Sequence, residues 1–135
     1  MTILLMLFLA ADLATIKATP DLEKRSDLAL ANAEQDVDAA RDAYKSGDVK
    51  KMETVLEDLR DSVTLAGDSL ELAPRRARNS KYYKRAELKT RALARRLNTL
   101  GNEVSVDDRK AIDDVRQKVQ EVHDHLLEDI MGNKK

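Results

Sequence analysis

The most constraining feature of this sequence is a run of apolar residues spaced alternately three and four apart between positions 49 and 70. The run consists of Val49, Met52, Leu56, Leu59, Val63, Ala66 and Leu70. This spacing places every member on one face of an α-helix, and charged residues fill many of the positions between them. Such a helix buries its apolar stripe against other helices. The segment therefore predicts an amphipathic helix in an all-α fold.

Three further segments carry apolar residues at helical spacing. Their expected inner positions are Leu30, Ala33, Val37, Ala40 and Tyr44, then Tyr83, Ala86, Leu93, Leu97 and Leu100, and finally Ile112, Val115, Val119, Val122, Leu126 and Ile130. The sequence has no sustained apolar–polar alternation, so we predict no β-sheet. We expect helices over about 20–45, 48–72, 80–100 and 105–131.

Short breaks separate these four segments. Thr19-Pro20 is typical of a helix start, with a hydroxyl cap before a proline. Ser46-Gly47-Asp48 and Gly101-Asn102 are typical of helix ends, Pro74 stops the second helix, and Ser105 to Asp108 resembles a capping box. Connections this short make neighbouring helices antiparallel. The predicted fold is an up-down-up-down four-helix bundle in which the third helix lies beside the second and the fourth.

The N-terminus differs from the rest of the chain. Residues 3–11 form a nine-residue apolar run, which is shorter than the roughly 20 residues that a transmembrane helix needs but fits a secretory signal. No Lys or Arg precedes the run, and Ala18 offers a small residue for cleavage. We expect a signal peptide over 1–18 and a single periplasmic or secreted domain over 19–135. The alternatives are an uncleaved segment that attaches the protein to a membrane, and a buried first helix of a cytosolic protein.

Charge is balanced overall but unevenly placed. The chain has 24 Lys and Arg against 25 Asp and Glu, yet residues 74–100 hold ten basic groups and one acidic group. One interpretation is a polyanion site, whose candidates are Arg75, Arg76, Arg78, Lys81, Lys84, Arg85 and Lys89, followed by Arg91, Arg95 and Arg96, with Tyr82 and Tyr83 available to stack on bases. The other, which we favour, is that these charges meet acidic groups on neighbouring helices.

Residues that would carry catalysis or bind a cofactor are scarce. The chain has no Cys, which excludes disulfides, zinc–thiolate sites and thiol nucleophiles. Its four glycines are isolated, and no serine sits in a Gly-x-Ser-x-Gly turn. We predict no enzyme and no cofactor. The one weak metal candidate is His125 with Glu121 and Asp129, four residues to either side, and we favour a solvated face there.

The sequence therefore predicts an exported helical bundle that acts by protein interaction, as a scaffold, adaptor or chaperone-like binder. The alternative is a module that binds a polyanion or a membrane surface through residues 75–96. The expected partner is a protein, or else an anionic polymer or lipid surface, and export argues against nucleic acid. A monomer and a dimer are both compatible with the pattern. Steep loss of affinity with rising salt would distinguish polyanion binding from the first function.

Overall fold

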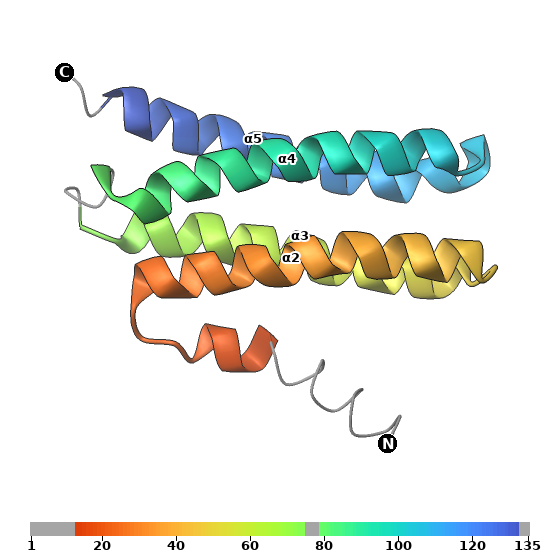
Figure 1. The fold of residues 1–135 in the computed structure, drawn as a ribbon, viewed down its shortest axis with the longest axis horizontal. Coiled ribbons are helices and arrows are strands. Elements are labelled where there is room, and N and C mark those ends of the chain that lie inside the picture. Colours follow the sequence, from red (N-terminus) through yellow and green to blue (C-terminus); the bar gives the residue numbers. More distant parts are fainter. Residues whose placement is uncertain (1–12, 75–78, 133–135) are drawn as a thin grey trace.

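The computed structural model describes residues 13–74 and 79–132, which are almost entirely helical and include no β-strand. This confirms the all-α prediction. The four long helices are α2 (Leu22–Lys45), α3 (Val49–Leu72), α4 (Lys81–Glu103) and α5 (Arg109–Gly132), with a short 3-10 helix, η2 (Val106–Asp108), before α5. The long helices lie side by side along the long axis of the molecule, and successive helices run in opposite directions (Figure 1).

The long helices form two hairpins. The most extensive packing is between α2 and α3 and between α4 and α5, and the hairpins meet through α2 against α4 and α3 against α5. Contact between α3 and α4 is slight, so the expectation that the third helix lies beside the second is wrong. Eight residues separate α3 from α4. At about 3.3 Å per extended residue, a connection of this length can span the diagonal between them.

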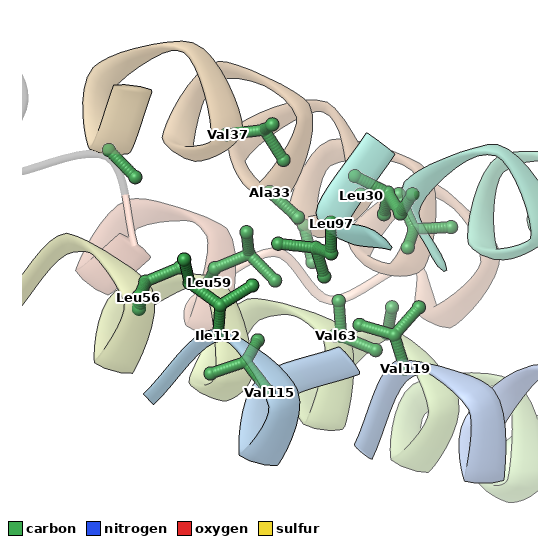
Figure 2. Close-up of a cluster of buried hydrophobic side chains, with 14 of the residues drawn as sticks. Leu30, Ala33, Val37, Leu56, Leu59, Val63, Leu97, Ile112, Val115 and Val119 are labelled. Carbon is green, nitrogen blue, oxygen red and sulfur yellow. The ribbon is translucent and has the colours of Figure 1, made fainter. Parts of the chain in front are cut away.

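Nearly all of the predicted inner positions form one buried core. Figure 2 shows side chains from all four long helices meeting there. The labelled residues are Leu30, Ala33 and Val37 of α2, Leu56, Leu59 and Val63 of α3, Leu97 of α4, and Ile112, Val115 and Val119 of α5, all at most 5% exposed. Tyr44, Val49, Val122 and Ile130 are only partly buried. Each fully buried large apolar side chain contributes about 1.5–3 kcal/mol relative to exposure, so this core dominates the stability.

The start of α2 lies later than the sequence indicated. Asp21, rather than Thr19, is the N-cap, and its carboxylate accepts a hydrogen bond from the Lys24 amide at 3.1 Å. The Thr19 hydroxyl instead donates to the carbonyl of Thr15, at 3.3 Å. Thr19 thus closes the preceding helical turn, and a carboxylate takes over the capping of α2.

The end of α4 also differs from the prediction, because the helix continues through Gly101 to Glu103. The carbonyl of Gly101 accepts a hydrogen bond from Arg109 Nε at 2.7 Å, and a Cβ added at Gly101 would lie 3.7 Å from the Ile112 side chain. Gly101 therefore lies inside the helix and does not end it, and a side-chain Cβ there would make only an ordinary contact with α5. The Ser105 hydroxyl donates to the Asp108 carboxylate at 2.8 Å and caps no backbone amide, so the predicted capping box is absent.

The apolar run over 3–11 lies outside the described residues, but the chain just after it is folded. Residues 13–17 are helical, and Ile16 is 7% exposed and belongs to the core cluster. Arg25 holds this segment through its Nη1, which donates to the carbonyl of Lys17 at 3.4 Å, and its Nε donates to Ser69 Oγ at 2.9 Å. Within the described ranges, no helix is both long enough and apolar enough to cross a membrane.

Removing the Ile16 side chain tests whether the segment over 13–17 contributes to stability. We expect Ile16→Ala to lower the free energy of unfolding by about 1 kcal/mol, less than for a central core residue because a short terminal segment can detach. Urea denaturation measures the change, with Lys17→Ala as the control because the Lys17 side chain is exposed. Equal midpoints for the Ile16 variant and the native chain would show that the segment adds nothing.

Candidate interaction surfaces

The surface seam between α2 and α4 is closed by ion pairs. Arg85 Nη1 lies 3.0 Å from Asp27 Oδ2, and Lys89 Nζ lies 3.7 Å from Asp27 Oδ1 and 3.3 Å from Glu34 Oε1. Arg96 Nη2 lies 2.6 Å from Asp38 Oδ1, and Arg41 Nε lies 3.0 Å from Glu103 Oε2. The basic helix is therefore matched to acidic groups, as the favoured interpretation held, but these belong to the first helix. Each exposed pair contributes only about 0–1 kcal/mol, so their main effect is to select this helix arrangement.

The predicted anion-binding residues do not form one free cluster. Arg75, Arg76 and Arg78 lie outside the described residues, and Arg85 and Lys89 are engaged by α2. Tyr82 is available only in part, since the Lys81 and Arg85 cations lie 5.4 and 5.6 Å from its ring centre.

Tyr83 is buried, and its hydroxyl donates to Asp129 at 2.8 Å. A ring that is only 1% exposed cannot stack on a nucleic-acid base. The expectation that Tyr83 adds stacking to the basic segment is therefore wrong.

One stripe of α4 does remain on the surface. We call it the α4 outer stripe, and it comprises Lys81, Lys84, Leu88, Arg91 and Arg95, all exposed. Their spacing of three and four residues places them on one face, opposite the inner positions of the helix. Leu88, in the middle, is 56% exposed. Among the described residues, Lys84 and Arg95 have no ion pair, and Arg91 pairs only with Glu87 of its own helix.

A polar pair is buried where α4 packs against α5. Glu87 and His123 are each 8% exposed, and His123 Nε2 lies 2.7 Å from Glu87 Oε2. The other ring nitrogen lies 3.1 Å from Asp124, and Arg91 Nη2 reaches the same Glu87 oxygen at 2.6 Å. The sequence did not predict an inner position for His123, although this residue follows Val119 by four residues and precedes Leu126 by three. That spacing was the available signal for an inner position.

The weak metal candidate at His125 is not assembled. His125 Nε2 lies 3.5 Å from Glu71 and 3.7 Å from Asp129, and Asp129 also accepts the hydrogen bond from Tyr83. Over residues 13–74 and 79–132, no group of three or more His, Asp or Glu side chains could hold a metal ion. His125 instead lies on the rim of a surface hollow between α3 and α5.

Three connected hollows run along the seam between α3 and α5, and we call them the α3–α5 groove. The first, of about 360 Å³, is lined by Lys50, Glu53, Thr54, Leu56, Glu57, Arg60, Ala111, Asp114 and Val115. The second, of about 260 Å³, is lined by Arg60, Asp114, Gln117, Lys118 and Glu121. The third, of about 220 Å³, is lined by Gly67, Asp68, Glu71, Lys118, Glu121, Val122, His125 and Leu126. Adjacent hollows share lining residues, so they follow one another along the seam.

The groove has a defined chemical pattern. Both end hollows have apolar side chains in their lining, whereas the lining of the middle hollow is polar and charged. Six acidic and three basic side chains line the whole groove. Within the described chain, the only ion pair that joins α3 to α5 is His125 with Glu71. The α3–α5 seam therefore keeps an excess of negative charge, unlike the neutralised α2–α4 seam.

Gly67 shapes one end of the groove. A Cβ added at this position would lie 3.0 Å from Cγ1 of Val122, closer than ordinary van der Waals contact. The absent side chain lets α3 approach α5 at this level. A side chain at position 67 would change the shape of the hollow beside Val122 and Leu126.

A second polar cluster joins α2 to α3. Asn32 Nδ2 donates to Asp58 Oδ2 at 2.9 Å and to Ser62 Oγ at 2.8 Å. The pKa of Asp36 is raised to about 9, first by burial and then by the hydrogen bond with Asp58 and the negative charge of Asp58. Asp36 is therefore protonated at neutral pH. Its Oδ2 atom is shielded from solvent and has no hydrogen-bond partner among the described residues.

Taken together, the described surfaces comprise one neutralised seam, one acidic groove and one basic stripe. Comparison with protein-family models, with curated proteins and with solved structures finds no match.

Proposed function

We propose that this chain is an exported up-down-up-down four-helix bundle that acts by protein interaction, as a scaffold, adaptor or small chaperone-like binder. The α3–α5 groove is its docking site. The observation that carries the proposal is the contrast between the two seams. Among the described residues, five ion pairs close the α2–α4 seam, whereas the α3–α5 seam has one such pair and a row of neighbouring hollows.

The dimensions and lining of the groove support protein docking. Its lining on α3 extends from Lys50 to Glu71, which is about 32 Å at 1.5 Å per residue. Apolar hollows surrounded by charged rims resemble the core-and-rim arrangement of protein interfaces. A long, shallow groove of this kind suits an extended or helical segment of a partner better than a small molecule, which needs a deeper and more enclosed pocket.

The bundle architecture rests on the contacts between helices, and export rests on the apolar run at the N-terminus. Cleavage after Ala18 would remove Ile16 from the core but would leave the four long helices and their shared core intact. The mature domain is then periplasmic or secreted. If cleavage does not occur, the same run would attach the protein to a membrane.

The polyanion function has weaker support. Arg85, Lys89 and Arg96 already contact carboxylates of α2. A polyanion that recruited them would have to displace those carboxylates, and the number of free cations sets the affinity for phosphates. We therefore place the interaction in the α3–α5 groove rather than on the basic helix.

Site-specific photo-crosslinking in the native cell tests the docking site. A photoreactive amino acid placed at Glu57 or Lys118, both in the groove, is expected to form adducts with other proteins. The same group at Gln35, which is exposed on α2, is expected to form none. Adducts from all three positions alike, or from none of them, would contradict the proposed site. Fractionation and intact mass test export, which predicts a mature N-terminus near Thr19.

A further inference from the structure

Two separate surfaces of the described chain carry charge excesses of opposite sign. The α4 outer stripe carries four cations around the exposed Leu88. The α3–α5 groove carries an excess of carboxylates around apolar hollows. In the described chain, Lys84 and Arg95 of the stripe have no ion pair, whereas Arg91 pairs with Glu87. Of the six groove carboxylates, only Asp114 and Glu71 have an ion pair, with Lys110 and His125 respectively. The two surfaces are thus complementary in both charge and apolar character.

We propose that the α4 outer stripe of one copy docks in the α3–α5 groove of a second copy of this chain. The inference rests on the proposed function, because it takes the groove as a docking site and names an occupant. Lys81 and Arg95 are fourteen residues apart, or about 21 Å along a helix, so the stripe fits within the groove of about 32 Å.

Leu88 supplies the apolar contact. It lies in the middle of the stripe, with Lys84 and Arg91 one turn to either side. The hollow of about 360 Å³, lined in part by Leu56, Ala111 and Val115, is large enough for a leucine side chain. The flanking cations then meet the carboxylates of the rim.

The geometry of this contact determines the kind of assembly. The two surfaces differ, so the contact is heterologous and each copy retains one free stripe and one free groove. Unless the rotation between copies closes a ring, the assembly grows with protein concentration. Because the contact depends on exposed charges, it weakens as salt screens them. A protein that scaffolds others through such a contact would build short chains of copies.

Sedimentation velocity of the full chain tests the proposal. We expect concentration-dependent association in about 20 mM salt and at least about a tenfold weaker association in about 300 mM salt. Lys84→Glu with Arg95→Glu is expected to abolish association by reversing the charge of the stripe. Glu57→Lys with Glu121→Lys is expected to abolish it by reversing the charge of the groove. Circular dichroism checks that each variant is folded.

Mixing the variant with the reversed stripe and the variant with the reversed groove provides the decisive test. The first retains the native groove and the second retains the native stripe, so the mixture is expected to associate although neither variant does alone. Lys24→Glu with Lys45→Glu is the matched control, because both lysines are exposed on α2 and the change in charge is the same. This control is expected to associate like the native chain.

A chain that stays monomeric at several hundred micromolar in about 20 mM salt would overturn the proposal. So would a mixture that fails to associate, or a control pair that loses association as fully as the stripe variant. These outcomes leave the proposed function standing if crosslinks from the groove to other proteins persist. Loss of those crosslinks with intact self-association would instead reject the wider function and retain the second copy as the occupant.

Discussion

Replacing Asp36 by asparagine is expected to stabilise the protein by about 3 kcal/mol near pH 8. The native carboxyl has its pKa raised from 3.8 to about 9, first by burial and then by Asp58. An unfolded chain ionises this group above pH 4, whereas the folded chain must bind a proton to accommodate it. Asparagine is neutral in both states and removes that requirement, and its amide can donate to Asp58 as the protonated carboxyl does.

The sign of the pH dependence follows from the direction of the shift. A raised pKa means that the folded state binds more protons than the unfolded state, so the free energy of unfolding falls as pH rises. The contribution of the protonated Asp36 carboxyl to the free energy of unfolding is fully present below about pH 4. It declines through the neutral range and is lost above about pH 9. Without screening by solvent, raising the pKa from 3.8 to about 9 would correspond to about 7 kcal/mol of unfolding free energy. Asp36 is partly exposed to solvent, which reduces the expected effect to about 3 kcal/mol.

Denaturation midpoints measured between about pH 5 and pH 9 check this prediction. The advantage of Asp36→Asn over the native chain is expected to grow with pH and to level off near pH 9. Asp61→Asn is the matched control, because Asp61 is exposed on α3. An Asp36 variant that is less stable than the native chain near pH 8, or an advantage that does not change with pH, would contradict the assignment.

The apolar pattern predicted the helices and the central core well. Val37, Leu59, Leu97 and Val119 are all fully buried, as their spacing indicated. Periodicity succeeds here because burial of one apolar stripe is the largest energetic term for each helix. It does not show which helices are neighbours, and the basic α4 lies against α2 rather than α3.

The polar part of the interior was not predicted, for a physical reason. A helix with two adjacent neighbours buries two stripes, and the second can be made of small and polar residues when each finds a hydrogen-bond partner. Asn32 and Ser62 form such a stripe between α2 and α3. In the sequence these residues look like ordinary surface positions, and only their tertiary partners distinguish them.

The α3–α5 groove could not be predicted from the sequence either. Its lining comes from two helices that are separated by all of α4. Its charge excess exists because, among the described residues, only two of its six carboxylates, Glu71 and Asp114, have an ion pair. The sequence did identify Glu121 and His125 as a polar face, but not the contribution of α3. The choice of neighbours, rather than any local motif, creates this surface.

Removing the carboxylate of Glu87 is expected to have the second large effect. We expect Glu87→Ala to lower the free energy of unfolding by about 3 kcal/mol, because it leaves the buried His123 ring without its 2.7 Å partner. Part of the loss comes from the space vacated between α4 and α5. The Arg91 side chain is half exposed and can turn to solvent, so the loss of its ion pair with Glu87 costs little free energy of unfolding.

A double replacement separates the value of the pair from the cost of breaking it. A buried polar pair can often be exchanged for apolar residues of similar volume without loss of stability. Glu87→Leu with His123→Leu is therefore expected to remain within about 1 kcal/mol of the native chain, while Glu87→Ala and His123→Ala are each clearly destabilised. Urea denaturation at pH 7 gives all of these values. The prediction is contradicted if the double variant loses as much unfolding free energy as the two alanine variants combined. In that case Glu87 and His123 each stabilise the α4–α5 interface through contacts other than the one between them.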